Sequence, residues 1–180
     1  IAREQGDAQL EVLALEKLGN NHAYVGKQAE SIEYSRLAVS RAISERYHTW
    51  AVMSWGALSE SLIENLAAEE ARRECESALK YVDDMGLDRY RPMVQGWLAL
   101  SLYRTGQISE ARTLAEHAFV TESKFAESRD SALIALIRAW MVVDSGDAVA
   151  SAVAVGEAEQ LVANQGVASW THEIAFIRAR

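Results

Sequence analysis

Apolar residues recur along the chain at steps of three and four, which is the spacing of a helix buried along one face. Between Tyr90 and Phe125, one stripe runs through Val94, Trp97, Leu98 and Leu102. Gly106 follows it and predicts a helix end, because glycine adopts a positive φ without steric cost. A second stripe then runs through Ile108, Ala111, Leu114, Ala115 and Ala118. The pattern predicts two helices joined by a short turn.

Small residues fall into register when the sequence is shifted against itself by 40 residues. Three columns hold only glycine, alanine or serine: Ala38, Ala78, Ala118 and Ala158; Ser31, Ala71, Ala111 and Ser151; Gly19, Ser59, Ala99, Ala139 and Ala179. Such columns are expected where two helix backbones approach closely, because a leucine there would overpack the contact. We therefore predict four repeats, at about 8–46, 47–86, 87–126 and 127–166, with partial repeats over 1–6 and 167–180.

Each repeat is predicted to hold two antiparallel helices. The first helices are expected near 8–25, 48–65, 88–105 and 128–145, and their partners near 28–45, 68–85, 108–125 and 148–165. The predicted fold class is all-α: an α-solenoid, a right-handed superhelix of helix-turn-helix repeats forming a single domain over 1–180. Both ends of the chain fall inside a repeat, so we expect it to be a piece of a longer protein.

Two positions depart from the repeat. Leu66 stands where Gly26, Gly106 and Gly146 lie between helices, and we expect Asn65 to take the left-handed conformation there. Arg138 replaces the leucine of the column that contains Leu58, so the register does not by itself predict how the fourth repeat packs there.

Composition narrows the class of protein. The 180 residues are 49% hydrophobic and 24% charged, with one proline and ten glycines, which excludes wholesale disorder and favours long helices. A net charge of −8 argues against nucleic acid as a partner, and no apolar run is long enough for a membrane span. The single cysteine, Cys75, excludes an intrachain disulfide and fits a reducing, cytoplasmic setting.

The sequence offers no catalytic or metal-binding constellation. The four histidines are far apart, and the Glu45-x-x-His48 spacing lies across a predicted turn. Cys75 shares its column with Ser35 and Ala115, which indicates a buried thiol rather than a nucleophile. No phosphate-binding or nucleophile motif occurs. We therefore expect no enzyme activity and no cofactor or metal.

The segments Leu18–Val39 and Ala99–Phe119 resemble tetratricopeptide repeats, with a leucine–small pair, an inter-helix glycine and small crossing residues. Such repeats usually span about 34 residues, and the longer 40-residue form resembles the arrays of MalT-like regulators of the LuxR family and those that follow ATPase or adenylyl-cyclase modules. The chaperone-binding form of the family is not matched, because Glu16 stands where its first lysine belongs.

The resemblance implies that the first helices line a concave groove. By register, its residues are Lys17, Asn20, Tyr24, Glu60, Ile63, Glu64, Trp97, Leu100, Tyr103, Arg104, Ile137, Trp140 and Asp144. Within this set we expect a partner to contact Trp97, Leu100, Tyr103, Arg104, Trp140 and Asp144, since aromatic side chains dominate interface hot spots. The alternative is that Trp97 and Trp140 pack between repeats.

Our leading hypothesis is a non-enzymatic interaction scaffold or sensor segment of a larger bacterial regulatory protein, with a peptide or helix in the groove. Alternatives are a small-molecule inducer site of a MalT-like regulator, and an accessory array of a multidomain ATPase or cyclase. We also expect end-to-end self-association through uncovered apolar faces, with Ile174, Ile177 and Trp170 exposed at the C-terminal end.

Overall fold

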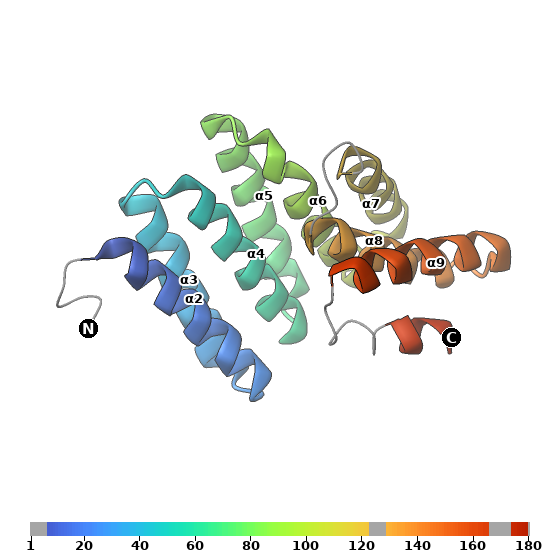
Figure 1. Ribbon diagram of the computed structural model, residues 1–180, viewed down its shortest axis with the longest axis horizontal. Coiled ribbons are helices and arrows are strands. Elements are labelled where there is room, and N and C mark those ends of the chain that lie inside the picture. The colour runs from blue at the N-terminus through green and yellow to red at the C-terminus, as the bar shows by residue number, and fades with distance from the viewer. Residues whose placement is uncertain (1–6, 123–128, 166–173, 180) are drawn as a thin grey trace.

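A computed structural model of the chain describes residues 7–122, 129–165 and 174–179 (Figure 1). Four antiparallel pairs make up most of it: α2 (Ala8–Tyr24) with α3 (Gln28–Ser44), α4 (His48–Glu64) with α5 (Ala68–Met85), α6 (Arg91–Arg104) with α7 (Ile108–Glu122), and α8 (Arg129–Val143) with α9 (Ala148–Gln165). A short 3₁₀ helix, η1 (Asp88–Tyr90), precedes α6, and residues 174–178 are helical. The predicted helix boundaries differ from these by three residues or fewer.

The helices form an α-solenoid, which confirms the predicted fold class. Each helix packs against its partner, and α2, α4, α6 and α8 also contact one another in sequence, so these first helices form one layer. The pairs follow one another from one end of the molecule to the other, and α8 and α9 are turned strongly relative to α2 and α3 (Figure 1). The described residues contain no strand, and none of their helices is long and apolar enough to cross a bilayer.

Sequence features explain where several helices begin. The Asp7 carboxylate accepts a hydrogen bond from the amide of Leu10 at 3.0 Å and so caps α2. Asp147 accepts bonds from the amides of Val149 and Ala150, both at 3.0 Å, at the start of α9. Pro92 lies in the first turn of α6, where its missing N–H removes no helical bond.

The turns between paired helices all place a left-handed residue at the same position of the repeat, which corrects our expectation for Asn65. The left-handed residue of the second repeat is Leu66, with φ of 60°, whereas Asn65 has φ of −82°. Leu66 thus holds the same position as Gly26, whose φ is 76°. The reason is the hydrogen bond that closes the turn, from Ala67 N to Leu62 O at 2.8 Å, which fixes the register of the turn whatever the side chain. A leucine there costs about 1–2 kcal/mol of backbone strain.

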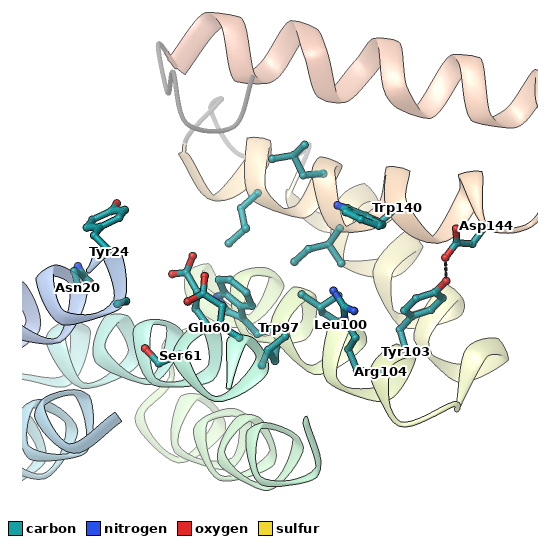
Figure 2. A pocket seen from close by; sticks show the side chains of 16 residues that line it. Asn20, Tyr24, Glu60, Ser61, Trp97, Leu100, Tyr103, Arg104, Trp140 and Asp144 are labelled. Atoms are coloured by element: carbon teal, nitrogen blue, oxygen red, sulfur yellow. Dashed lines mark hydrogen bonds between the residues drawn. The ribbon is translucent and has the colours of Figure 1, made fainter. Parts of the chain in front are cut away.

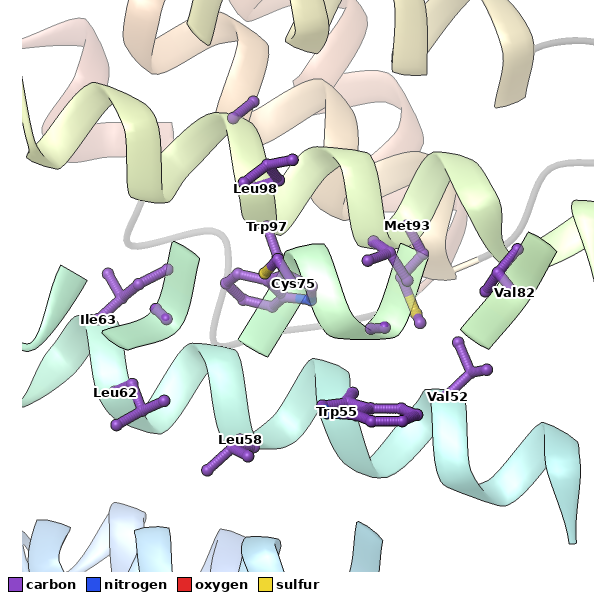
Figure 3. Packing of buried hydrophobic residues seen from close by; sticks show 14 of the residues in the cluster. Val52, Trp55, Leu58, Leu62, Ile63, Cys75, Val82, Met93, Trp97 and Leu98 are labelled. Carbon is purple, nitrogen blue, oxygen red and sulfur yellow. The ribbon is translucent and has the colours of Figure 1, made fainter. Parts of the chain in front are cut away.

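The most regular small column is buried, as its spacing predicts. Ala38, Ala78, Ala118 and Ala158 are all fully buried between helices. Larger side chains fill the spaces beside them, and the main group, which we call the first cluster, comprises buried residues of α2 to α7 together with Ile137 and Met141 of α8. Figure 3 shows part of it, with Trp97 of α6 and Cys75 of α5 among the residues drawn. A second cluster joins α8, α9 and residues 174–177.

Arg138, which departs from the leucine column, has charged and aromatic partners in the fourth repeat. Its side chain is 17% exposed and its guanidinium donates to Glu116 at 2.6 Å and to Glu157 at 2.5 Å. The same group lies 4.6 Å from the centre of the Phe119 ring. Two carboxylates and a cation–π contact therefore satisfy the charge of Arg138.

The two ends of the stack differ. Leu18, which shares a column with the buried Leu58, is 41% exposed on α2, because no described helix packs on its outer side. Our expectation that Ile174 and Ile177 are exposed is wrong: they are 4% and 1% exposed, because their short helix folds back onto α8 and α9. Trp170 and the partial repeat 1–6 lie outside the described residues. End-to-end association stays a prediction.

Candidate functional site: a groove along the four first helices

One groove of about 550 Å³ runs along the layer of first helices (Figure 2). Every one of the four helices contributes to it: α2 gives Asn20, Ala23 and Tyr24; α4 gives Glu60, Ser61, Ile63 and Glu64; α6 gives Trp97, Leu100, Tyr103 and Arg104; α8 gives Leu133, Leu136, Ile137, Trp140 and Asp144. The groove is therefore a product of the repeat array, and no single repeat could form it.

The 40-residue period decides which side chains meet in the groove. One column crosses the four helices as Asn20, Glu60, Leu100 and Trp140, and the next, one helical turn later, as Tyr24, Glu64, Arg104 and Asp144. Residues four apart lie on the same face of a helix, so the two columns run side by side. The backbone repeats across the groove, while the first column changes from polar and acidic to apolar and aromatic and the second runs from Tyr24 through two charged residues to Asp144.

The floor of the groove consists of side chains that are also part of the core. Trp97 is 7% exposed and Ile137 is 3% exposed, and both belong to the first cluster. Gly56 lets the indole approach, because a Cβ added there would lie 3.4 Å from Trp97 Nε1. Gly96 similarly brings α6 close to α8, since a Cβ there would lie 3.2 Å from Ile134 Cγ1. A closely packed floor fixes the shape of the groove.

The walls are less buried than the floor. Trp140 is half-buried on α8, and its ring centre lies 5.4 Å from that of Phe176. Tyr24 is 80% exposed at the α2 end, and Leu100 is half-buried between them on α6. Figure 2 shows Trp140 and Leu100 on facing helices, with Tyr24 at the opposite end. Large apolar and aromatic surfaces are thus open to a ligand.

Charged groups are distributed unevenly in the lining. Glu60 and Glu64 are exposed on α4, and a side-chain amide, Gln28 Nε2, donates to Glu64 Oε2 at 3.2 Å. On the other side, Tyr103 Oη donates to the carboxylate of Asp144 and links α6 to α8. Arg104 is the only cation among the described residues of the lining, and its guanidinium has neither an ion pair nor a hydrogen bond with another described residue. The lining therefore carries three carboxylates and one guanidinium.

The structure brings the sequence-predicted residues together. All six residues expected to contact a partner line the groove, and so do the other predicted positions except Lys17, which lies outside it beside Glu16. Contact with a partner stays a prediction. Trp97 packs between repeats and also forms the floor of the groove, and its contact with a partner stays a prediction.

The sequence reasoning missed four lining residues: Ala23, Ser61, Leu133 and Leu136. Leu136 shares its column with Gly56 and Gly96, and this pair of glycines 40 residues apart was a signal of close helix approach. Leu133 lies two turns before Trp140 on the same face, which also could have identified it.

The described residues hold no group of His, Cys, Asp or Glu arranged to bind a metal ion. The thiol of Cys75 lies away from the groove, 1% exposed, and burial raises its pKa to about 12 despite a hydrogen bond with Ser59. Such a thiol stays protonated at neutral pH and is a poor nucleophile. The features of the groove that can bind a ligand are therefore its shape, its apolar surface and its charged side chains.

Comparisons with known proteins identify the fold. No protein-family model and no curated protein sequence matches the chain. Among solved structures, the apo form of RapI is similar with a TM-score of 0.68 at 12% identity, over 88% of this chain and 44% of that one. A signal-transduction ATPase with numerous domains from Pyrococcus horikoshii, PH0952, which has a tetratricopeptide repeat sensor, is similar with a TM-score of 0.65 at 17% identity, over 96% of this chain and 27% of that one. The chain spans less than half the length of either protein, and it shares with them a helical-repeat fold.

Proposed function

We propose that this chain is a non-enzymatic interaction module that binds a segment of a partner protein in the groove along α2, α4, α6 and α8. One observation carries the proposal: a single groove of about 550 Å³ joins aromatic and aliphatic side chains from all four first helices. Half-buried aromatic residues give large contact area at low entropic cost, which is typical of interface hot spots. An amphipathic helix or an extended peptide is the matching ligand.

The module acts within a larger regulatory protein, as a sensor or scaffold segment. Two features support this placement: the chain spans 27% of a solved ATPase whose repeats are described as a sensor, and 44% of RapI. A repeat array with an open groove can couple ligand binding to a neighbouring domain, since each repeat packs only against its neighbours.

A small-molecule inducer is the second candidate ligand. The volume of the groove lies within the range of about 300–1,000 Å³ that is usual for small-molecule sites. The groove is long and crosses four helices, which favours a peptide over a compact molecule.

Selection from a random-peptide display library on the wild-type chain tests the proposal. Trp140→Ala removes a wall of the groove, and Trp50→Ala is the matched control, because Trp50 is also half-buried but lies outside the lining. We expect selected peptides that bind wild type and the Trp50 variant and lose at least about tenfold in affinity on the Trp140 variant. Peptides that bind all three proteins equally, or no enrichment at all, would contradict the proposal.

A further inference from the structure

We infer that the partner segment is basic as well as apolar, with its Lys or Arg side chains over α4 and its apolar side chains against α6 and α8. This inference rests on the proposed function and adds the chemistry of the ligand. The evidence is the distribution of charged and apolar side chains over the helices within the two columns that line the groove.

The acidic part of the groove comes from α4. Glu60 and Glu64 lie one turn apart on its exposed face, in neighbouring columns, so their carboxylates line the same stretch of groove. In the same columns, α2 contributes the neutral Asn20 and Tyr24. None of the α2 and α4 residues that line the groove is basic.

The apolar part comes from α6 and α8, which in the neighbouring column also contribute Arg104 and Asp144, whose carboxylate accepts a hydrogen bond from Tyr103. Leu100 and Trp140 continue the column of Glu60, and Leu136 and Ile137, which are 5% and 3% exposed, lie beside them. A ligand that covers both parts must present apolar side chains on one side and positive charge on the other. That is the composition of a basic amphipathic helix or strand.

Arg104 sets the direction of the ligand. It follows Glu64 in its column and lies on α6, so a positive side chain placed over α6 meets a like charge. The same side chain over α4 meets two carboxylates. Attraction on one helix and repulsion on the next fix the register of a bound segment, which is how charges contribute to specificity. The net charge of −8 adds long-range attraction for a basic partner.

The test uses a display library whose peptides share apolar positions and carry Lys, Gln or Glu in equal proportions at the remaining positions. Selection on the wild-type chain is expected to enrich Lys over Glu among the peptides that depend on Trp140. Enrichment of Glu or of neither charge in that group would overturn the inference and leave the proposed function standing. If no peptide depends on Trp140, the proposed function fails first, so the two failures are distinguishable.

Charge variants give a second, quantitative readout with the selected peptides. Glu60→Gln with Glu64→Gln is expected to weaken binding about tenfold and to reduce its dependence on salt. The matched control is Glu33→Gln with Asp84→Asn, which removes the same two charges from exposed sites outside the groove. The control is expected to change affinity by less than about twofold.

Arg104→Gln completes the design. It removes the like charge on α6, and we expect it to leave affinity unchanged or to raise it, and to admit Lys at peptide positions that wild type rejects. Equal losses in the groove double variant and in its control would overturn the inference, because the effect would then come from net charge alone. Weaker binding of basic peptides to the Arg104 variant would overturn it as well.

Discussion

Trp97 and Trp140 line the same groove, yet their surroundings differ. Trp97 is 7% exposed on α6, with Gly56 and the first cluster around it. Trp140 is half-buried on α8, at the edge of the second cluster, with the 56% exposed Phe176 as its ring neighbour. The floor of the groove is thus part of the core, whereas its wall can lose a side chain at a smaller cost in stability. This difference distinguishes residues that maintain the fold around the groove, such as Trp97, from residues that a ligand can contact, such as Trp140.

The largest effect is expected for Trp97→Ala. Removing a buried indole leaves a cavity in the first cluster and should lower the free energy of unfolding by about 3–5 kcal/mol. Denaturation in urea, followed by circular dichroism, measures the loss. A loss below about 1 kcal/mol would show that Trp97 belongs to the wall and not to the floor.

Ala118→Leu is expected to cost about 1–3 kcal/mol by overpacking. Ala118 is fully buried at a helix contact and does not line the groove, so its variant tests the packing of the repeats alone. Selected peptides should bind the folded variant with wild-type affinity. An unchanged denaturation midpoint would mean that the column of small residues has room for larger side chains.

Trp140→Ala should cost about 1–2 kcal/mol, because a half-buried ring loses less contact than a buried one. The variant therefore stays folded while it loses peptide binding. A loss of stability as large as that of Trp97→Ala would remove the distinction between floor and wall, and the groove assignment with it.

Leu66→Gly is expected to raise the free energy of unfolding by about 0.5–1 kcal/mol, since glycine relieves left-handed strain but adds unfolded-state entropy. Leu66 is 92% exposed, so little packing is lost. Gly106→Ala, at the equivalent position with φ of 86°, is the opposite control and should destabilise. Equal signs for the two variants would contradict the turn geometry.

The smallest effect is expected for thiol labelling of Cys75 in the folded protein, which should be very slow. Burial holds its pKa at about 12, above the ordinary value of 9.0, so a thiol reagent at pH 8 should label the chain only after the first cluster opens. Because the folded state keeps this proton longer than the unfolded state, the thiol lowers stability as pH rises from about 9 toward 12. Cys75→Ala should lack this slope. Rapid labelling of the native protein would show that the cluster is open at Cys75.

The 40-residue register, combined with the tetratricopeptide resemblance, was sufficient to predict most of the residues that line the groove. Its residues fall at fixed distances from the small columns, so Glu60, Leu100 and Trp140 could be assigned to one face before any tertiary contact was known. Leu133 and Leu136 were missed, because a leucine on a core-facing stripe and a leucine in a groove have the same sequence signature.

The sequence by itself determined the local structure: the helices, because the apolar period repeats every turn, and the order of the pairs, because small residues recur every 40 positions. Only the tertiary structure decided how deeply each side chain is buried and which partners it has. The burial of Trp97, the fold-back of Ile174 and Ile177, and the ion pairs of Arg138 all depend on side chains supplied by other helices. A helical pattern fixes the direction in which a side chain points, whereas its burial is fixed by the neighbour that covers it.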